Sequence, residues 1–283
     1  MIKMKMNNTS VNIKIVGICL IKNEDLFVER VLKNIINFCD EIIVLDNMST
    51  DNTFEIVKRL TREYNKIKLF ELEDPLKSHK FIEKYAITNT WVFGVDGDEI
   101  YDPAGLDRLR LEILLGKYQT KWQIMGNSLH CKEINLESKT AKGYLAPPSR
   151  PMTKLYNFSI LKSWNEDCSQ RLHGKNLIFK EGFDKSLKYN IYEKYNWDDS
   201  YFRCLHLCFI NRSSFDPRNR NIIRLNPQQS SRKLSLVKNF ICNLLNGRIS
   251  FNINYKKLRY YGQGELVVKD IQPFFSKINE EVL

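Results

Sequence analysis

Three acidic residues directly follow a short apolar segment, residues 91–95, in the first half of the chain. They are Asp96, Asp98 and Glu99, and Gly97 between them lets the backbone turn. Neighbouring carboxylates repel one another unless a cation or a polar network offsets their charge. Mg²⁺ and Mn²⁺ prefer oxygen ligands and commonly bind carboxylates together with substrate phosphates. The segment therefore predicts either a metal–diphosphate site or a polar turn that ends a core strand.

Apolar segments alternate with segments of helical periodicity along the first third of the chain. The expected strands cover 13–21, 41–45, 67–72 and 91–95. Helices are expected between them, the last over 77–89, so the pattern predicts a parallel sheet wound with helices. Ligands of such open sheets bind beyond the carboxyl ends of the strands. We therefore expect Asn23, Asp46 and Asp96, each just past or at a strand end, to converge on one crevice.

The second part of the chain has a different pattern. A helix is expected from Asp102-Pro103 to Gly116, where the cap, the proline and the glycine are favoured. The remaining segments are expected to be strands at 118–134, 155–156, 160–164 and 203–210, with a polar loop over 135–153. Alternation in the last strand places Cys204, His206 and Cys208 on one face. Three ligands along one strand are too far apart for one tetrahedral zinc ion, so we discount that site.

Composition limits the class of protein. With 283 residues and 43% hydrophobic residues, the chain can bury a large core. Its seven cysteines are odd in number and several lie in apolar segments, which favours a reducing compartment over a disulfide framework. No segment approaches the roughly 18 uncharged apolar residues of a membrane span. We expect a cytoplasmic protein, and its net charge of +11 favours an anionic partner.

Much of that positive charge lies near the carboxyl end. Residues 217–263 contain no acidic residue, and an amphipathic helix is expected over 231–246. Cationic side chains on a helix are usually only a solvated face. The length of the basic segment nevertheless predicts that the helix rests on the anionic inner surface of a membrane, as a peripheral contact.

Three blocks of sequence resemble the family 2 glycosyltransferases in order and spacing. They are Val16-Gly17-Ile18-Cys19-Leu20-Ile21-Lys22-Asn23-Glu24, Asp40-Glu41-Ile42-Ile43-Val44-Leu45-Asp46-Asn47-Met48-Ser49-Thr50-Asp51-Asn52-Thr53 and Val95-Asp96-Gly97-Asp98-Glu99. The resemblance implies a GT-A fold, a Rossmann-like mixed sheet flanked by helices, here with a basic helical extension. It implies a nucleotide-sugar donor, Mn²⁺ or Mg²⁺, and usually inversion. We expect a catalytic domain over 1–215, with a nucleotide-binding half 11–100 and an acceptor half 101–215, and an extension over 216–283.

The resemblance also implies roles for single residues. The residues it implies in nucleotide-sugar binding are Ile21, Lys22, Asn23, Asp46, Asp96 and Gly97, with Asp46 holding the base. Asp98 matches the stronger metal ligand, and His206 is a candidate further ligand that could instead be a core histidine. Asn47-Met48-Ser49 departs from the second acid and the glycine of many members. A metal-binding Asp98 should face an open cleft and should not be locked in an internal ion pair.

Inverting transfer also needs a carboxylate that accepts the proton of the acceptor hydroxyl. Asp167, with Glu166 next, resembles the family's acidic pair and follows Trp164, which could stack on a sugar. A solvated acidic turn is an equally simple interpretation, and Asp198-Asp199 is a rival pair.

The sequence thus predicts a glycosyltransferase that modifies a glycan or lipid-linked acceptor in surface polysaccharide, lipopolysaccharide or capsule. Three alternatives remain open at this point, and the first is a catalytically inactive scaffold, which applies only if the carboxylates bind no metal. A nucleotidyltransferase of the same fold would need a glycine-rich, basic triphosphate loop, which Lys22-Asn23-Glu24 lacks. A basic protein that binds nucleic acid or membranes without catalysis explains the charge, but acidic clusters at strand ends would repel nucleic-acid phosphates, so no nucleic acid is expected.

Overall fold

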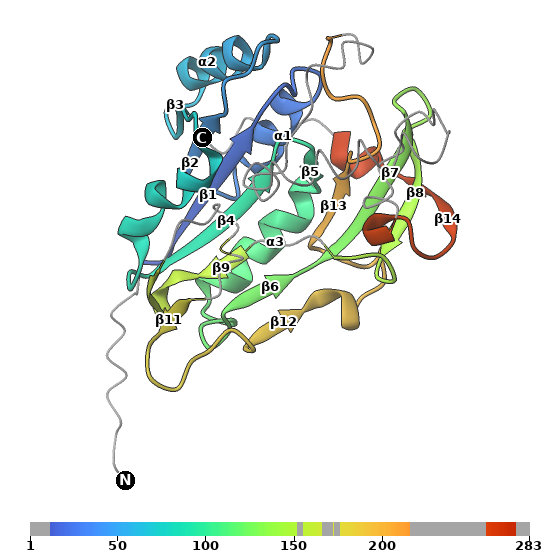
Figure 1. Ribbon diagram of the computed structural model, residues 1–283. Helices are drawn as coiled ribbons and strands as arrows, with labels where there is room; N and C mark the ends of the chain where they lie inside the picture. Colours follow the sequence, from blue (N-terminus) through green and yellow to red (C-terminus); the bar gives the residue numbers. More distant parts are fainter. Residues whose placement is uncertain (1–11, 152–154, 166–171, 173–175, 216–258, 276–283) are drawn as a thin grey trace, which may run out of the picture.

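The computed structural model describes residues 12–151, 155–165, 172, 176–215 and 259–275. A seven-stranded sheet in the order β12-β6-β9-β4-β1-β2-β3 contains the four strands expected at the start of the chain (Figure 1). These four parallel strands are β1 (Lys14–Ile21), β2 (Glu41–Asp46), β3 (Ile67–Glu71) and β4 (Thr90–Asp96). The predicted α/β fold, a mixed sheet flanked by helices, is confirmed.

Later segments extend this sheet beyond β4. Strand β9 (Leu155–Asn157) runs antiparallel to β4 and to β6 (Gln123–Met125), and β12 (Lys188–Asn190) is parallel to β6. Strands β10 (Leu161–Trp164) and β11 (Leu177–Phe179) form a separate antiparallel pair. The helices are α1 (Val28–Ile35), α2 (Thr53–Glu63) and α3 (Pro103–Leu114).

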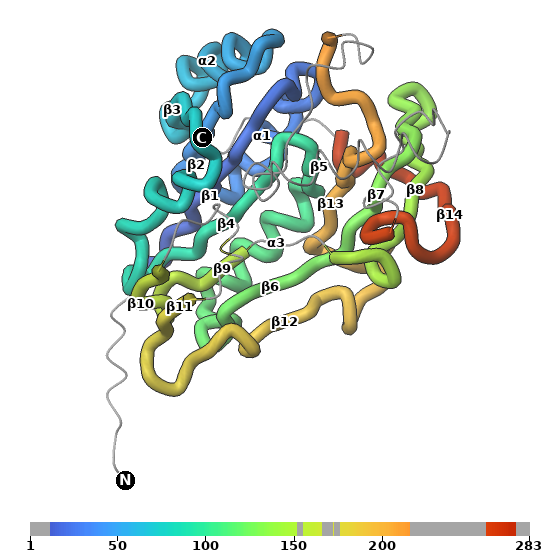
Figure 2. The backbone as a smooth tube through the Cα atoms, viewed as in Figure 1, coloured from blue at the N-terminus to red at the C-terminus, as the bar shows by residue number. Residues whose placement is uncertain are grey.

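A second sheet has the order β14-β8-β7-β13-β5. Its strands are β5 (Glu99–Tyr101), β7 (Asn127–Asn135), β8 (Thr140–Ala146), β13 (Arg203–His206) and β14 (Leu266–Asp270). Figure 2 shows β14, coloured red near the end of the described chain, beside the β7–β8 hairpin. Although 259–275 falls within the predicted extension, β14 is therefore part of this sheet.

Three sequence-based expectations for regular structure differ from the structure. The helix expected over 77–89 is instead two 3₁₀ turns, Pro75–Phe81 and Glu83–Tyr85. Ile87 has φ +58°, which an α-helix does not accommodate, and His79 is held by a 2.9 Å hydrogen bond from the Trp164 indole. Tertiary contacts therefore outweigh the helical periodicity of this segment.

The polar loop expected over 135–153 contains strand β8. The Asn135 side chain accepts hydrogen bonds from the backbone of Glu137 and Ser138, both at 2.9 Å, and this turn returns the chain along β7. Its polar residues misled the prediction because one side of this hairpin is only partly covered. Conversely, the strand expected over 203–210 is shorter and ends at His206.

An aromatic cluster joins the two sheets. The ring of Phe93 on β4 lies 5.2 Å from Phe38, 4.8 Å from Tyr101 on β5, and 6.0 Å from Phe202 just before β13. All four side chains are almost completely buried. Because β4, β5 and the start of β13 share this core, the residues that follow these strands are held at fixed positions.

Polar contacts secure the same region. The Asp102 carboxylate caps α3 through the Gly105 amide, accepts a 3.0 Å hydrogen bond from Arg203 Nε, and forms an ion pair with Arg203 Nη2 at 2.9 Å. On α1, the buried Asn34 amide donates to the carbonyls of Tyr101 and Phe274, each at 2.8 Å. The segment before residue 276 is thereby tied to the first helix.

Within the described residues, no helix is both long enough and apolar enough to span a bilayer. The basic helix expected over 231–246 lies outside the described residues.

We predict that two leucines on α3 differ sharply in their contribution to stability. Leu109→Ala should lower the free energy of unfolding by about 2–5 kcal/mol, because its completely buried side chain leaves a cavity. Leu111→Ala, on the same helix but 63% exposed, is the matched control and should change it by less than about 0.5 kcal/mol. Urea unfolding followed by circular dichroism measures both. Equal losses would contradict the placement of α3.

Candidate active site

The ends of β1, β2 and β4 meet at one edge of the large sheet. Ile21, the last residue of β1, is paired in register with Asp46, and Leu20 is paired with Asp96. The carbonyl of Ile21 also accepts a 2.9 Å hydrogen bond from the Asn47 amide. The structure therefore brings the predicted residues at these three strand ends together, with Asp46 and Asp96 on either side of β1.

Asn23 connects the loop after β1 to the loop after β2. Its φ is +53°, and its side-chain oxygen accepts a 2.8 Å hydrogen bond from the Thr50 amide. The backbone amide of Asn23 donates to the Ser49 hydroxyl at 3.0 Å, and the backbone amide of Ser49 donates to the Asp46 carboxylate at 2.8 Å. Ser49, part of the departure from the family pattern, thus bridges two predicted donor-binding residues.

Glu24 lies under this loop and is completely buried. Its amide donates to the Thr53 hydroxyl at 2.7 Å, and its carboxylate accepts from the Lys22 amide at 3.4 Å. A Cβ atom on Gly97 would lie only 1.9 Å from that carboxylate and 2.9 Å from Ile21. Only glycine fits at position 97, because the turn after β4 packs directly on the loop after β1.

Asp98 and His206 meet through strand pairing. Strand β5 starts at Glu99, which pairs in antiparallel register with His206 at the end of β13. The Leu207 amide donates to the Asp98 carbonyl at 2.8 Å, which continues this pairing. As a result the His206 Nε2 atom lies 3.7 Å from Asp98 Oδ2, and both side chains are almost fully buried.

Arg212 contacts the same carboxylate. Its guanidinium Nη1 forms an ion pair with Asp98 Oδ2 and lies 3.6 Å from Glu24 Oε1. The arginine side chain is 11% exposed. Asp98 is thus almost fully buried and held in an internal ion pair, contrary to the expectation for a metal ligand that faces an open cleft. A metal ion could use both Asp98 oxygens only if the guanidinium withdraws.

The segment around Arg212 lies across the loops that follow β1 and β2. The Leu26 amide donates to the Arg212 carbonyl at 3.1 Å, and the Ser213 hydroxyl donates to Asp51 at 2.5 Å. The Ser214 amide donates to Asp25 at 2.7 Å. Arg212 is therefore positioned by backbone contacts as well as by its ion pairs.

Acidic side chains are concentrated at this edge of the sheet. The buried carboxyl groups are those of Glu24, Asp46, Asp96, Asp98 and Glu99. Burial raises the pKa of Asp46, and its hydrogen bonds from Ser49 partly offset this while the charges of Asp51 and Glu71 add to it. The Asp96 amide donates to Glu99 at 3.1 Å, and so does the Tyr101 hydroxyl at 3.3 Å. Such a cluster attracts cations strongly.

The donor set suits Mn²⁺ or Mg²⁺. Asp98 supplies carboxylate oxygens, His206 supplies Nε2 within 3.7 Å of one of them, and Asp96 is two residues away on the same turn. Carboxylates and imidazole are ligands that Mn²⁺ accepts, with remaining positions filled by phosphate oxygens or water. Arg212 forms an ion pair with Asp98, which indicates that a positive charge is favoured beside this carboxylate.

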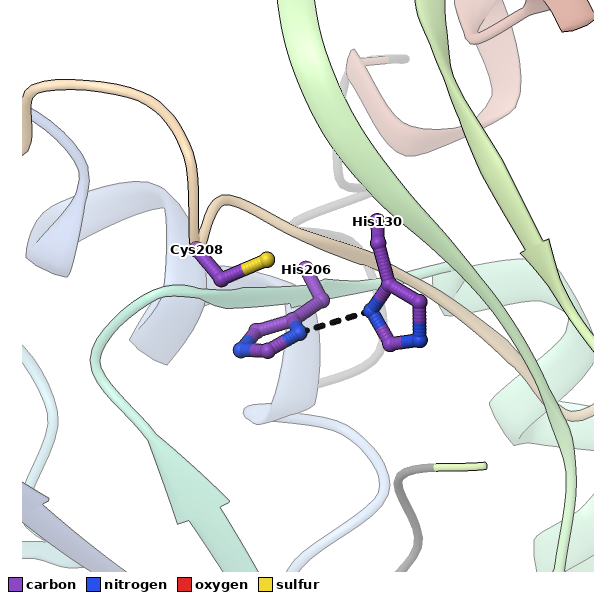
Figure 3. Close-up of side chains that lie close together, drawn as sticks. All are labelled: His130, His206 and Cys208. Atoms are coloured by element: carbon purple, nitrogen blue, oxygen red, sulfur yellow. Dashed lines mark hydrogen bonds between the residues drawn. The ribbon is translucent and has the colours of Figure 1, made fainter. Parts of the chain in front are cut away.

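A second group of possible metal ligands adjoins His206. His130 on β7, His206 and Cys208 are all buried, and their ligand atoms lie within 4.8 Å of one another (Figure 3). The Nδ1 atoms of the two histidines are 2.8 Å apart, and His130 Nε2 lies 3.0 Å from the Arg150 carbonyl. Burial, and secondarily the charge of His206, lowers the pKa of His130 to about 3, so His130 is neutral near pH 7.

The predicted proton acceptors, Asp167 and Glu166, lie outside the described residues. Trp164, expected to offer its face to a sugar, is 8% exposed and packs in the core against His79 and Phe158.

The rival acidic pair lies at the opposite end of β13 from His206. The Asp198 carbonyl accepts a hydrogen bond from Arg203, the first residue of β13, and its carboxylate pairs with Lys269 at 2.7 Å. The Asp199 carboxylate accepts from Asn196 at 2.7 Å. Neither carboxylate has a described contact to the Asp98 site, which weighs against this pair as the base.

Sequence reasoning missed three residues of the site. Glu24 was named only as part of the first block of resemblance, His130 was not singled out, and Arg212 was counted only among the chain's cations. His130 meets His206 because β7 and β13 pair in parallel with these residues in register, across 76 residues of sequence. The one available signal was the group of acidic residues near the strand ends. Buried carboxylates need a compensating positive charge, which another part of the chain had to supply.

Comparisons with solved structures give distant likenesses. A mannosyltransferase of Pyrobaculum calidifontis, in complex with GDP-Man and Mn²⁺, is 24% identical, with 42% of this chain and 36% of that chain covered and a TM-score of 0.31. A glucosyl-3-phosphoglycerate synthase of Mycobacterium tuberculosis is 22% identical, with 41% and 44% covered and a TM-score of 0.30.

Sequence comparisons are more informative. An uncharacterized glycosyltransferase of Rickettsia conorii is 33% identical over 150 residues, which is 53% of this chain and 50% of that protein. One of Rickettsia typhi is 34% identical over 86 residues, 30% of this chain and 28% of that protein. The matched part of the chain thus spans half or less of these relatives.

The strongest finding concerns the family. Residues 18–187, well over half of the chain, match the family described as glycosyl transferase family 2. This match includes all three blocks of sequence that suggested the resemblance except the first two residues of the first block, and the GT-A fold expected from it is confirmed. The chain therefore belongs to glycosyl transferase family 2.

Proposed function

We propose that this chain transfers a sugar, with inversion, from a nucleotide-sugar donor to a glycan or lipid-linked acceptor of a surface polysaccharide such as lipopolysaccharide or capsule. The observation that carries the proposal is the meeting of Asn23, Asp46 and Asp96 at the carboxyl edge of β1, β2 and β4. In open α/β sheets this edge is where nucleotides bind. The proposal for the surface polysaccharide rests on the family resemblance alone.

In this proposal, the first half of the chain holds the donor. Asp46, fixed by Ser49, accepts a hydrogen bond from the nucleotide base. Ile21, Lys22 and Asn23 line the nucleotide pocket, while Asp96 and Gly97 face the sugar and diphosphate. The close packing of Gly97 on Glu24 supports this arrangement, because it holds the turn after β4 against the loop after β1.

Asp98 and His206 hold Mn²⁺ or Mg²⁺ in this proposal. The bound ion would stabilise the negative charge that develops on the diphosphate leaving group. The residues' own part is to hold a carboxylate and an imidazole nitrogen at one point, which the β5–β13 register does. Arg212 must leave Asp98 for the ion to bind, and its guanidinium is then available for the diphosphate or for Glu24.

A second candidate follows from the Arg212 contact itself. If the guanidinium stays on Asp98, it supplies the positive charge near the diphosphate, and sugar transfer proceeds without a metal ion. The observation favouring this candidate is the ion pair of Arg212 Nη1 with Asp98 Oδ2, with Glu24 3.6 Å away.

We assign proton acceptance from the acceptor hydroxyl to Asp167, with Glu166 as its alternative. The assignment rests on the resemblance to the family's acidic pair. Asp198 and Asp199 lie at the opposite end of β13 from His206, which makes them less suitable as the proton acceptor and so supports Asp167.

We also propose that the basic segment 217–263 brings this cytoplasmic enzyme to an anionic membrane surface. The domain boundary at 215 and the extension from 216 belong to the same proposal, except that residues 259–275 return to the second sheet through β14. Its support is the absence of acidic residues over 217–263 and the net charge of +11.

The first prediction from these proposals concerns Mn²⁺ affinity, measured by isothermal titration calorimetry. Asp98→Asn should weaken binding by at least about tenfold, because the amide loses the ligand's charge. Arg212→Gln should strengthen it by about 10- to 100-fold, since a hydrogen bond to a charged group contributes about 1.5–3 kcal/mol. Asp107→Asn, on the exposed side of α3, is the control and should leave the affinity unchanged.

Turnover in EDTA then separates the two candidates. Loss of transfer in EDTA with recovery on adding Mn²⁺ supports the metal-dependent proposal. Full activity in EDTA, together with loss of activity in Arg212→Gln, would contradict it and favour the guanidinium as the cation.

The second prediction concerns the base. Asp167→Asn should lower kcat by about 10²–10⁴-fold with little change in donor affinity, because only proton acceptance is removed. Asp199→Asn, the matched substitution in the rival pair, should retain activity. Full turnover in a variant lacking both Asp167 and Glu166 carboxylates would show that the base lies elsewhere.

The third prediction concerns membrane binding in a vesicle flotation assay. Replacing Arg232 and Lys233 by glutamine should weaken binding to phosphatidylserine vesicles roughly 30-fold, at about 1 kcal/mol per cation. The same replacement at the exposed Lys185 and Lys188 removes equal charge elsewhere and should have little effect. Unmodified protein that fails to float at low salt would exclude the membrane proposal.

A further inference from the structure

His130 makes two hydrogen bonds, and together they determine where its proton lies. Its Nε2 atom is 3.0 Å from the Arg150 carbonyl oxygen, and its Nδ1 atom is 2.8 Å from His206 Nδ1. A carbonyl oxygen only accepts, so His130 Nε2 must carry the hydrogen. His130 is completely buried, and its two described ring contacts are a carbonyl oxygen and an imidazole rather than a carboxylate, so a positive charge on this ring would be uncompensated. In the neutral ring, the Nδ1 atom has a lone pair and no hydrogen.

This assignment fixes the proton of His206. Because His130 Nδ1 accepts, His206 Nδ1 must donate, whether the His206 ring is neutral or protonated. The nitrogen of His206 that can offer a lone pair is therefore Nε2. That is the atom 3.7 Å from Asp98 Oδ2.

Without His130, the hydrogen of a neutral His206 would favour Nε2 instead of Nδ1. Asp98 is the carboxylate nearest to His206 Nε2, and a carboxylate stabilises an N–H that points toward it. A neutral His206 would then carry its hydrogen on Nε2, where it would block a metal ion. His130 keeps that hydrogen on the other side of the ring.

We propose that His130 is a positioning residue that holds His206 as the Nδ1–H tautomer, leaving Nε2 directed at Asp98 as a ligand for the divalent ion. The inference rests on the proposed function, because the ion belongs to that proposal. His130 itself touches neither the ion nor the substrate.

The surrounding fold keeps this pair in place. His130 and His206 are register partners on the parallel strands β7 and β13, and the ring of Tyr261 packs 4.7 and 5.1 Å from theirs. The Arg150 amide donates to the Tyr260 carbonyl at 2.8 Å, which fixes the peptide segment whose carbonyl accepts from His130. The two rings are nearly perpendicular, at 75°, with the Nδ1 atoms facing each other (Figure 3).

Cys208 offers a different interpretation, in which His130, His206 and Cys208 hold one ion. Two nitrogen ligands of a tetrahedral ion, each about 2.0–2.1 Å from it, are roughly 3.3 Å apart. The two Nδ1 atoms are closer, at 2.8 Å, which is a hydrogen-bond distance. The geometry therefore favours a shared proton over a shared ion, and the three-ligand site becomes an outcome of the test.

The test combines nitrogen NMR with metal titration. The chain has four histidines, so long-range ¹H–¹⁵N spectra of histidine-labelled protein can be assigned by single substitutions. In alkaline, metal-free buffer His206 should carry its hydrogen on Nδ1. In His130→Phe the hydrogen should move toward Nε2, and Mn²⁺ affinity should fall about 10- to 100-fold, as is usual when the partner of a ligating histidine is lost.

His79→Phe is the matched control. His79 is also a buried histidine, but it accepts a hydrogen bond from the Trp164 indole, which packs against Phe158. This variant should leave both the His206 tautomer and the Mn²⁺ affinity unchanged. His130→Asn keeps an acceptor oxygen near the position of Nδ1 and should restore most of the affinity lost in His130→Phe. Thermal unfolding confirms that each variant is folded.

Several outcomes overturn the inference. One is a hydrogen on His206 Nε2 in the unmodified protein, and another is unchanged Mn²⁺ affinity in folded His130→Phe. A third is metal binding, with Zn²⁺ or Mn²⁺, that is lost in Cys208→Ser but retained in Asp98→Asn, because the ion would then belong to the three-ligand cluster. If the protein binds no Mn²⁺ but shows the Nδ1–H tautomer, the proposed metal site fails while the role of His130 in fixing the proton stands.

Discussion

Burial of like charges is the constraint on which this site depends. Five carboxyl groups with at most 7% exposure lie at the ends of β1, β2 and β4 and at the start of β5. Carboxylates in such a position are unfavourable unless cations or hydrogen-bond donors compensate them. Ser49 compensates Asp46, the Asp96 amide and the Tyr101 hydroxyl compensate Glu99, and Arg212 compensates Asp98. Asp46 and Glu99 are thus compensated by residues close in sequence, whereas Asp98 is compensated by Arg212 from a distant segment.

The second sheet brings His206, and Arg212 a few residues after it, to the acidic cluster. Strand β5 continues directly from the turn that contains Asp98, and β13 pairs with β5 on one side and β7 on the other. A shift of one residue in β13 would replace His206 by an apolar neighbour and separate it from both Asp98 and His130. The aromatic contacts of Phe93 with Tyr101 and Phe202, and the pairing of Asp102 with Arg203, keep that register.

The four parallel strands at the start of the chain were predictable because their signals are local. Buried parallel strands have continuous apolar segments, and the polar residues that follow β1, β2 and β4 must gather at one edge. Where local pattern and tertiary contacts disagree, the prediction was wrong, as in the 3₁₀ turns after Pro75 and the hairpin strand β8. His130 and Arg212 could not be found from sequence, because their roles depend on pairings between residues far apart in the chain.

The tie between residues 149–150 and 260–263 has a consequence for how this chain can vary. The Ser149 hydroxyl and the Gln263 backbone exchange two hydrogen bonds, both at 2.9 Å, and the Tyr260 carbonyl holds the Arg150 peptide that accepts from His130. The end of the described chain is therefore a structural support for the sheet that carries His206. Insertions or deletions between residues 215 and 259 are compatible with the fold only if the polypeptide still returns to these contacts. The number of residues between the two positions can therefore vary, whereas the contacts of residues 260–263 must be kept.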